Sequence, residues 1–446
     1  AETKPVELSE YQTFLIGLQG VGPVGGERYD GEDGVMRVIE QLEGIALPPS
    51  VWESSVLPAR VRDYRPAMLD GLLSSGEIVW VGSKTTGSKA KEPGLVALHP
   101  ADSLLLTVQD GEKNGEAPGE PVTLPDAVMA VLAPGGAYHA NQLAGLTRAA
   151  WDASSECVDE STGEILPHPW SDSQFEEALW SLVWQGKVTN SSFDPLRSLG
   201  ASSHAVKAPA RASRRRVRVR VSVPANMTGL WSAVPHADMR EERVAIARVE
   251  ALLDRYGVIA PPMIDKERLD GGFSGLYPVL RRMEEHGALM RGMFVSGCGA
   301  AQFASRQTVD ALRACAAEPS AVVLDATDPA NLYGSVIAWP RTIGGFSIRP
   351  ARRSGASVVL RGGRLLAYAV PRSHHLLLAQ DADPALQQAC NELAYALQRN
   401  LRDGGIRGGV TFCDANDEPL TARGEWSRML HVAGFVPVPQ GMKLYC

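Results

Sequence analysis

Apolar residues in the middle of the chain recur at the spacing of amphipathic helices. The stretch from Ala251 to Phe303 begins with a helical repeat that Gly257 ends, and Pro261 opens a second short helix. Residues 288–290 and 293–295 then form two short extended runs. Between them and Pro261, a third helix that ends at Gly287 carries an apolar face formed by Phe273, Leu276, Tyr277, Leu280 and Met283. This order predicts a winged helix, whose third helix typically enters a nucleic-acid groove.

The same plan occurs twice earlier in the chain. The first copy has predicted helices at 8–16, 34–42 and 67–74, with wing strands at 77–82 and 94–99. The second copy has helices at 126–132, 140–149 and 173–184, and its wing begins at 187–190. Trp180 and Trp184 are four residues apart among apolar neighbours, which favours a place in the core over a base-stacking role.

Beyond the third winged helix the pattern changes to short strands separated by Gly, Pro and Arg. These strands are predicted at 321–327, 335–339, 357–360, 365–369 and 376–379, and Gly362-Gly363 marks a hairpin. A helix at 384–401, a strand at 409–413, a helix at 425–433 and a final strand from Phe435 complete the chain.

The predicted fold class is therefore α+β. Tandem winged-helix domains are followed by a small β-barrel or strongly bent sheet and by a C-terminal α/β segment. The expected boundaries are 1–108, 109–235, 236–317, 318–383 and 384–446.

Composition narrows the class of protein. The chain has 446 residues, of which 44% are hydrophobic and 21% charged, as in ordinary globular proteins. No apolar run reaches the roughly 20 residues of a membrane span, and the first residues lack a signal-peptide core. The six cysteines include no CxxC pair. A soluble cytoplasmic protein with no membrane partner and no metal site is expected.

Positive charge is concentrated in two stretches although the formal net charge is −7. Residues 207–220 and 329–380 contain no acidic residue, and a local field rather than the total charge governs nucleic-acid binding. The first stretch also suits a solvated linker or an edge strand. The candidate phosphate-binding residues are Arg214, Arg215, Arg216, Arg218 and Arg220 in the first stretch and Arg341, Arg349, Arg352, Arg353, Arg361 and Arg364 in the second.

The third winged helix contributes Arg281, Arg282 and Arg291 as further candidates. Glu284 and Glu285 partly cancel their charge, and winged helices also serve as protein-docking modules. Contact with nucleic acid is therefore one of two interpretations of this domain.

Three other motifs indicate no chemistry of their own. The segment 82–89 resembles a phosphate loop, but Ser88 stands where the lysine should be, so this chain should not hydrolyse ATP. His374-His375 lacks partners at metal-ligand spacing. Gln302 is interpreted as a packing or hydrogen-bonding residue rather than a catalytic one.

Several long segments resemble the C-terminal region of the large helicase-related (Lhr) proteins, superfamily 2 DNA translocases of bacteria. These segments are IEQLEG at 39–44, LPARVRDYRPAMLDGLLSSGEIVWVG at 57–82, ALWSLVWQGKVTNSSFDPLR at 178–197, DRYGV at 254–258, GGFSGLYPVLRRMEEHGALMRGMFVSGCGAAQFA at 271–304, DPANLYG at 328–334 and GFVPVPQGMKL at 434–444. The resemblance implies that two motor domains, which use ATP and Mg, precede this region. It also implies single-stranded DNA or an RNA–DNA hybrid, the motor domains and a second copy of the chain as partners.

This region of the family is in turn similar to the AlkZ-type DNA glycosylases, which carry Gln-x-Gln or Gln-x-Asp in their first winged helix. The resemblance places Gln41 and Glu43 at that motif. A carboxylate and an amide there suit cleavage of an N-glycosidic bond, because they can hold water and stabilise an oxocarbenium-like sugar. Glu43 departs from the motif, so two functions stay open: a nucleic-acid-binding and assembly module, or a glycosylase that excises uracil or alkylated bases.

Overall fold

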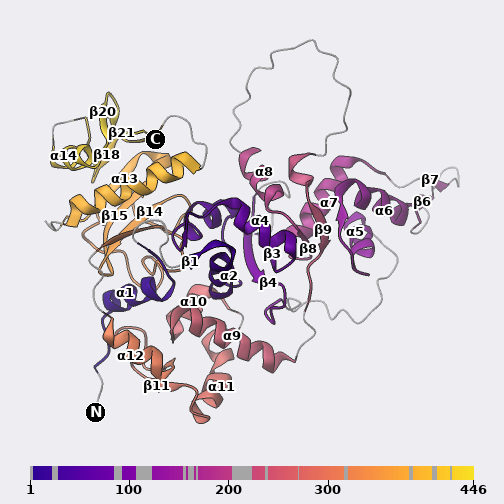
Figure 1. The fold of residues 1–446 in the computed structure, drawn as a ribbon, viewed down its shortest axis with the longest axis horizontal. Helices are drawn as coiled ribbons and strands as arrows, with labels where there is room; N and C mark the ends of the chain where they lie inside the picture. Colours follow the sequence, from indigo (N-terminus) through magenta and orange to yellow (C-terminus); the bar gives the residue numbers. More distant parts are fainter. Residues whose placement is uncertain are drawn as a thin grey trace. The chain divides into compact units, whose positions relative to one another are not determined.

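The computed structural model describes most of the chain and divides it into two compact units. The described residues are 4–22, 29–84, 93–106, 123–153, 157–158, 165–166, 169–202, 224–236, 240–269, 271–315, 320–380, 385–403, 409–421 and 424–445. The first unit comprises Ala1–Leu42, Val51–Arg65 and Glu241–Cys446, and the second comprises Glu43–Ser50 and Pro66–Arg240. Figure 1 traces both along the sequence.

The second unit contains helices and short antiparallel wings in the predicted order. Helix α4 (Pro66–Ser75) leads into the hairpin of β3 (Ile78–Ser83) and β4 (Leu95–Pro100). A three-stranded sheet in the order β5-β9-β8 follows. The other elements of this unit are α5 (Leu124–Leu132), β5 (Tyr138–His139), α6 (Ala140–Asp152), β6 (Cys157–Val158), β7 (Ile165–Leu166), α7 (Asp172–Trp184), β8 (Val188–Asn190), α8 (Asp194–Ser202), the 3-10 turn Ala225–Met227 and β9 (Leu230–Ala233).

Tryptophan side chains form much of the core of this unit. Trp180 is fully buried and Trp184 nearly so, and Trp180 packs edge-on against Trp231 at 5.6 Å between ring centroids. The hydroxyl of Thr189 donates to the carbonyl of Trp80 at 2.7 Å, which ties β8 to β3. The prediction that Trp180 and Trp184 belong to the core is confirmed.

The first unit contains the third winged helix. Its helices are α9 (Glu241–Tyr256), α10 (Pro261–Glu267) and α11 (Gly272–Glu285), followed later by α12 (Arg306–Ala314). Its sheet has the order β10-β12-β11, from β10 (Val258–Ile259), β11 (Met290–Gly292) and β12 (Gln302–Ala304). Helix α11 matches the predicted third helix closely, because its apolar repeat is long. Helix α9 begins ten residues before the predicted repeat, and α12 was not predicted.

The predicted second wing strand at 293–295 is wrong. The strand that pairs with β11 is β12, nine residues further along the chain than the predicted strand. Two other groups occupy the backbone of the predicted strand. The side-chain oxygen of Gln302 accepts from the amides of Phe294 and Val295 at 2.9 Å, and Val6 bridges to Val295. Gln302 is thus a buried hydrogen-bonding residue, as the sequence predicted.

The N-terminal segments of the first unit are short. Helix α1 (Leu8–Leu18) precedes β1 (Tyr29–Asp30) and α2 (Gly31–Gln41). The helical turn α3 (Pro49–Val51) continues into a π-helical turn at Trp52–Val56, and β2 (Val61–Arg62) pairs in parallel with β1.

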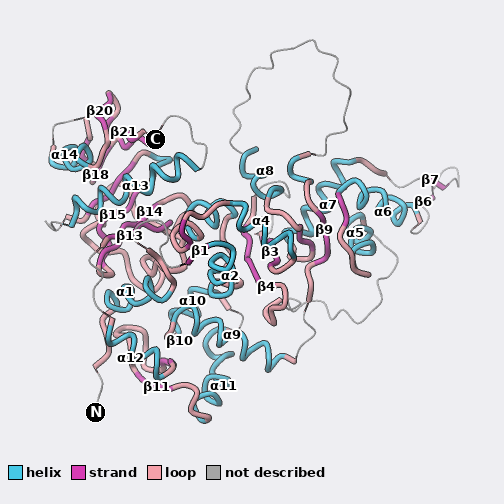
Figure 2. The backbone as a smooth tube through the Cα atoms, in the orientation of Figure 1, coloured by secondary structure: helices cyan, strands magenta, loops and turns pink. Residues whose placement is uncertain are grey.

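The predicted β-barrel is wrong, because the strands form an open six-stranded sheet. Its order is β13-β14-β15-β16-β18-β19, and β13 and β19 do not pair with each other. The strands are β13 (Ala321–Asp325), β14 (Ser357–Arg361), β15 (Arg364–Val370), β16 (His375–Leu378), β18 (Asp414–Ala415) and β19 (Glu418–Pro419). The parallel pairing of β16 with β18 extends the sheet with C-terminal residues instead of closing it. Figure 2 shows its central strands in magenta.

Two of the predicted elements in this region also differ. Residues 335–339 form no strand and make only a bridge between Tyr333 and Ile337. The final strand is a hairpin of β20 (Val436–Val438) and β21 (Gly441–Leu444), which joins β17 (Val410–Phe412) in the order β17-β21-β20. Helix α14 (Glu425–Val432) precedes that hairpin.

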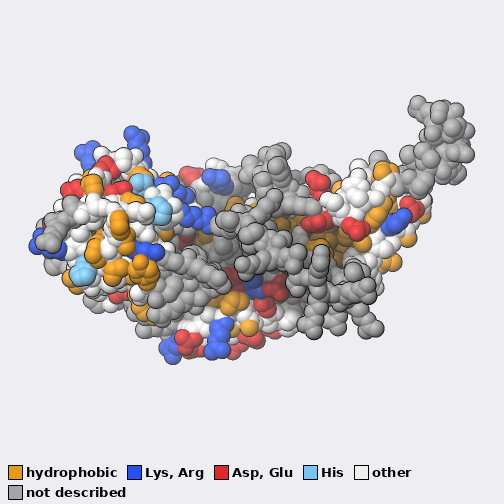
Figure 3. Space-filling model, turned by 90° about the horizontal axis from the view of Figure 1, so that it is seen from above, with side chains coloured by type: hydrophobic (Ala, Val, Ile, Leu, Met, Phe, Trp, Pro, Cys, Tyr) orange, Lys and Arg blue, Asp and Glu red, His pale blue; other side chains and the backbone are white. Residues whose placement is uncertain are grey.

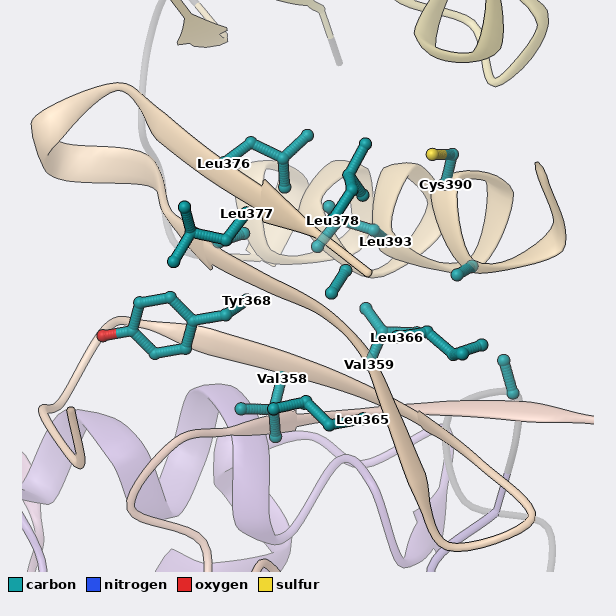
Figure 4. Close-up of a cluster of buried hydrophobic side chains, with 14 of the residues drawn as sticks. Val358, Val359, Leu365, Leu366, Tyr368, Leu376, Leu377, Leu378, Cys390 and Leu393 are labelled. Carbon is teal, nitrogen blue, oxygen red and sulfur yellow. The ribbon is translucent and has the colours of Figure 1, made fainter. Parts of the chain in front are cut away.

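Helix α13 (Ala385–Asp403) lies along the six-stranded sheet and buries its apolar residues there. Figure 4 shows Cys390 and Leu393 of this helix on the same side as Leu376 and Leu378 of β16. Burial of each such leucine contributes about 2 kcal/mol.

The hairpin between β14 and β15 confirms the Gly362-Gly363 signal. Arg361 pairs with Arg364 across the turn, and Gly363 has φ +73°. A Cβ at Gly363 would lie 1.8 Å from the carbonyl oxygen of Ser9 in α1. Only glycine permits this contact, so the turn residue also fixes where the N-terminal helix sits on the sheet.

A fully buried ion pair connects the N-terminal segments of the first unit to the strand region. The two terminal guanidinium nitrogens of Arg60 donate to the carboxylate of Asp328, at 2.8 and 3.0 Å. Both side chains are 0% exposed. Arg60 also donates to the carbonyl of Val56 and to the side chain of Gln19, each at 3.0 Å.

Amide side chains extend this contact. Gln12 donates to the carbonyl of Ala330 at 2.6 Å and accepts from the amide of Leu332 at 2.9 Å. Gln19 donates to the carbonyl of Arg255 at 3.0 Å. We call Gln12, Gln19, Arg60, Arg255 and Asp328 the buried polar network.

We predict that Asp328→Asn destabilises the chain by about 3–5 kcal/mol, because it leaves the Arg60 guanidinium buried without its counter-charge. The matched control is Arg37→Gln, which removes the half-exposed pair of Arg37 with Asp254 at 2.8 Å. That change should cost no more than about 1 kcal/mol. Urea unfolding measures the loss of stability in both variants. Equal losses would contradict the conclusion that the buried pair matters more than the half-exposed one.

Candidate functional site

The first candidate catalytic residue, Gln41, is held by the backbone. It is the last residue of α2 and is 1% exposed. Its Nε2 donates to the carbonyls of Leu18 and Asp254, at 3.0 and 2.9 Å. Among the described residues its Oε1 has no hydrogen-bond partner. A flipped amide would set oxygen against two carbonyl oxygens, so Oε1 is the unsatisfied atom of this side chain. It is buried and does not face solvent.

The second candidate, Glu43, belongs to the other compact unit. Its Oε1 lies 3.0 Å from Nδ1 of His99, and the two side chains are 12% and 8% exposed. His99 is on β4. Glu43 lies beside it because the next residue, Gly44, donates its amide to the carbonyl of Leu98 on the same strand. Sequence analysis missed His99, which is 56 residues from Glu43 and carries no motif.

The arginines of the third winged helix are largely engaged with acidic or aromatic partners. Arg281 pairs with Glu285 at 2.9 Å, and Arg282 pairs with Glu242. Arg291 lies over the ring of Tyr277, 6.0 Å from its centroid. All three side chains are exposed, and the positive charge of α11 is partly neutralised.

Most arginines of the strand region are exposed. Arg341, Arg349, Arg353 and Arg364 are exposed, and Arg361 is half-buried. On the face shown in Figure 3, Lys and Arg side chains lie among hydrophobic ones over the C-terminal part of the chain. This acid-free segment therefore presents several guanidinium groups to solvent.

Arg352 has a different role from its neighbours. Its two terminal nitrogens donate to the carbonyls of Asn331, Thr327, Tyr333 and Asp328, at 2.6 to 3.3 Å. Burial lowers its pKa, and the charge of Asp328 opposes that shift. These donors hold the loop 327–333 and are already engaged with backbone carbonyls, unlike those of the exposed arginines.

The arginines predicted in the first basic stretch, Arg214, Arg215, Arg216, Arg218 and Arg220, lie outside the described residues. Within the described ranges, no group of three or more His, Cys, Asp or Glu residues is placed to hold a metal ion. Among the same residues, no helix has the length and apolar character needed to cross a membrane.

Lys266 on α10 is a titratable group that sequence analysis did not single out. Its Nζ donates to the carbonyl of Pro329 at 2.5 Å and lies 5.2 Å from the ring centroid of Tyr256. Its pKa is lowered to about 7, first by burial and then by the charge of Arg352. Perturbed lysines occur at active sites, but this amine is directed at the protein's own backbone.

The chain is similar to known proteins both in sequence and in fold. Residues 6–101 and 238–323 match two winged-helix domains described as "Large helicase-related protein, winged-helix domain". The fold is also similar to that of the Streptomyces sahachiroi DNA glycosylase AlkZ, with a TM-score of 0.53 and 14% identity, over 92% of this chain and 100% of that one. The class is thus a tandem winged-helix protein.

Two longer relatives narrow the class to a family. Escherichia coli Lhr helicase/uracil glycosylase is 37% identical over 99% of this chain and 29% of its own length. The Mycolicibacterium smegmatis Lhr helicase/probable uracil glycosylase is 37% identical over 87% of this chain and 25% of its own length. The chain belongs to the Lhr family and spans less than a third of these relatives.

We predict that Lys266 makes stability rise with pH. Its folded pKa, about 7, lies below the unfolded value of about 10.4. Between these values the unfolded chain binds a proton that the folded chain lacks, so unfolding becomes less favourable as pH rises. Urea unfolding of the chain and of Lys266→Met at pH 7, 8 and 9 should show a smaller rise in the variant. An identical rise in both would show that Lys266 does not titrate in this window.

Proposed function

We propose that this chain is the nucleic-acid-binding and assembly module of a bacterial ATP-dependent 3′–5′ DNA translocase or helicase that acts in DNA repair. The motor domains, with their ATP and Mg, would belong to other parts of the larger protein. The proposal is supported by the names of the two relatives and by the small share of their length that this chain spans.

The observation that carries the proposal is the acid-free segment 329–380 with its exposed arginines. The chain as a whole is negative, at −7, so attraction for a polyanion must come from a local positive surface. Guanidinium groups bind phosphate oxygens through paired donors, and Arg341 and Arg349 are exposed on this segment. The ligands proposed are single-stranded DNA and RNA–DNA hybrid.

Assembly is the second part of the proposal. Several large apolar side chains of the C-terminal segment are exposed, which suits contact with a second copy of the chain or with the motor domains. These side chains are Tyr395, Val432, Val436 and Tyr445.

We predict that the double variant Arg341→Gln/Arg349→Gln binds single-stranded DNA at least about tenfold more weakly at low salt. Each lost phosphate contact should also reduce the slope of log affinity against log salt by about 0.7. The measurement is fluorescence anisotropy with a labelled oligothymidylate across a salt series.

The matched control is Arg281→Gln/Arg282→Gln, which removes two arginines that pair with Glu285 and Glu242. Its loss of affinity should be smaller, because these charges are already partly neutralised. Unchanged binding in the first double variant would contradict the proposed surface.

The second candidate function is excision of damaged bases through Gln41 and Glu43. The names of the relatives and the pairing of Glu43 with His99 favour it. An imidazole that donates from Nδ1 would hold the carboxylate oriented toward a developing positive charge on the sugar. The target nucleotide would have to leave the base stack first.

For this candidate we predict that Glu43→Gln lowers release of uracil from labelled single-stranded DNA by about a hundredfold or more, the usual effect of removing an acid–base group. Glu40→Gln, one turn earlier on α2, is the control and should retain full release. Release by Glu43→Gln at the parental rate would exclude Glu43 as the catalytic group.

A further inference from the structure

Trp339 is more exposed than the two aromatic residues that it packs against, Tyr333 and Tyr368, which are buried. Four tryptophans elsewhere in the chain, Trp52, Trp80, Trp180 and Trp231, are 0% exposed. Trp339 is only partly buried and lies in an irregular loop between β13 and β14. Part of the indole is therefore open to solvent on the segment that carries the exposed arginines.

Three aromatic rings and one guanidinium form a continuous stack around this residue. Trp339 stacks on Tyr333, with 6.3 Å between centroids and 25° between planes, and meets Tyr368 edge-on at 5.6 Å. Arg353 lies over Tyr368, 5.9 Å from its ring centroid, and its Nε donates to the Tyr368 hydroxyl at 2.9 Å. Figure 4 shows that Tyr368 lies beside the apolar core of the sheet.

The backbone holds the indole in one place. Gly334 has φ +77°, and a Cβ there would lie 2.6 Å from three atoms of the indole ring. The amide of Gly334 donates to the carbonyl of Ile337 at 2.7 Å, which turns the chain back toward its own start. These contacts position Trp339 before a ligand arrives, which lowers the ordering cost of binding.

The charge around Trp339 is mainly positive. Arg341 is two residues away, and Arg349 and Arg353 are exposed on the same loop. Among the described residues, one carboxylate binds this loop. It belongs to Asp417, which accepts from the amide and the hydroxyl of Ser347. An aromatic ring flanked by guanidinium groups is the combination that binds single-stranded nucleic acid, because bases stack on the ring while phosphates meet the charges.

We propose that Trp339 is a base-stacking residue, and that the loop 335–353 is a binding site for single-stranded nucleic acid rather than for a duplex. This inference rests on the proposed nucleic-acid-binding function and, of the two ligands proposed there, selects the single strand over the RNA–DNA hybrid. In a duplex the bases are already stacked on each other, so the indole has no face to meet.

The test compares Trp339→Leu and Trp339→Phe with the parental 446-residue chain. The probes are a labelled oligothymidylate, an oligouridylate and a duplex of equal length, with affinity measured by anisotropy. Trp339→Leu should lose about fivefold to a hundredfold in affinity for both single strands, the effect of removing one stacked base. It should lose less than about twofold for the duplex and leave the salt slope unchanged, since no charge is removed. Trp339→Phe should retain most of the binding.

Leu146→Ala is the control, since it removes an exposed large apolar side chain from α6, which is not part of this loop. Its binding should equal that of the parental chain. Circular dichroism and thermal unfolding show which variants are folded. The inference is overturned if folded Trp339→Leu binds the single strands as tightly as the parental chain, or loses duplex and single-strand affinity equally.

A second measurement requires no variant. An oligonucleotide that carries 5-iodouracil, when irradiated on the parental chain, should crosslink to a peptide that contains Trp339. Crosslinks found only on other peptides would overturn the inference while leaving nucleic-acid binding intact. A parental chain that binds none of the probes would instead contradict the proposed function itself.

Discussion

The buried pair of Arg60 and Asp328 is the interaction on which the first unit depends most. These residues are 268 positions apart in the sequence, and neither side chain is exposed. An ion pair in the interior costs desolvation free energy for both partners, and it is tolerated only where hydrogen bonds satisfy the remaining polar atoms. Val56 and Gln19 supply such bonds to the terminal nitrogens here, while Nε of Arg60 has no partner among the described residues. The pair therefore contributes more to specifying which segments meet than to net stability.

The segment DPANLYG shows how a short motif can be entirely structural. Asp328 binds Arg60, the carbonyl of Ala330 and the amide of Leu332 bind Gln12, and the hydroxyl of Tyr333 donates to the carbonyl of Gly363. Arg352 closes the loop from the other side through four carbonyl oxygens. This loop also ends at Gly334, against which Trp339 packs. The same interactions that fix the interior thus position the proposed surface residue.

Much of the fold was predictable from the sequence because its information is local. Long apolar repeats located α11 and α7 within one or two residues, and glycines marked the ends of α7, α9 and α11, but the start of α9 at Glu241 was not predicted. The second wing strand was not predictable, since a buried side chain, Gln302, satisfies backbone amides that would otherwise pair in a strand. The prediction of a barrel was wrong because β18 pairs with β16 and extends the sheet. Between these two strands the sequence contains a whole helix, so the pairing leaves no local signal.

The candidate site was predictable only in its residue types. The absence of acids from 329–380 located an arginine-bearing surface, but no sequence pattern separates Arg352, which binds carbonyls, from exposed Arg353. His99 was missed because its contact with Glu43 arises from the wing strand returning to the turn after α2. Both cases depend on contacts between distant segments, which periodicity does not encode.

The central claim is that nucleic acid binds this chain on the arginine-bearing strand region. Hydrogen–deuterium exchange of the chain, with and without a saturating single-stranded oligonucleotide, tests it most directly. Slower exchange in peptides covering 335–353, with little change in α11, is the predicted result. Protection confined to α11 and its wing, with none in the strand region, would contradict the account.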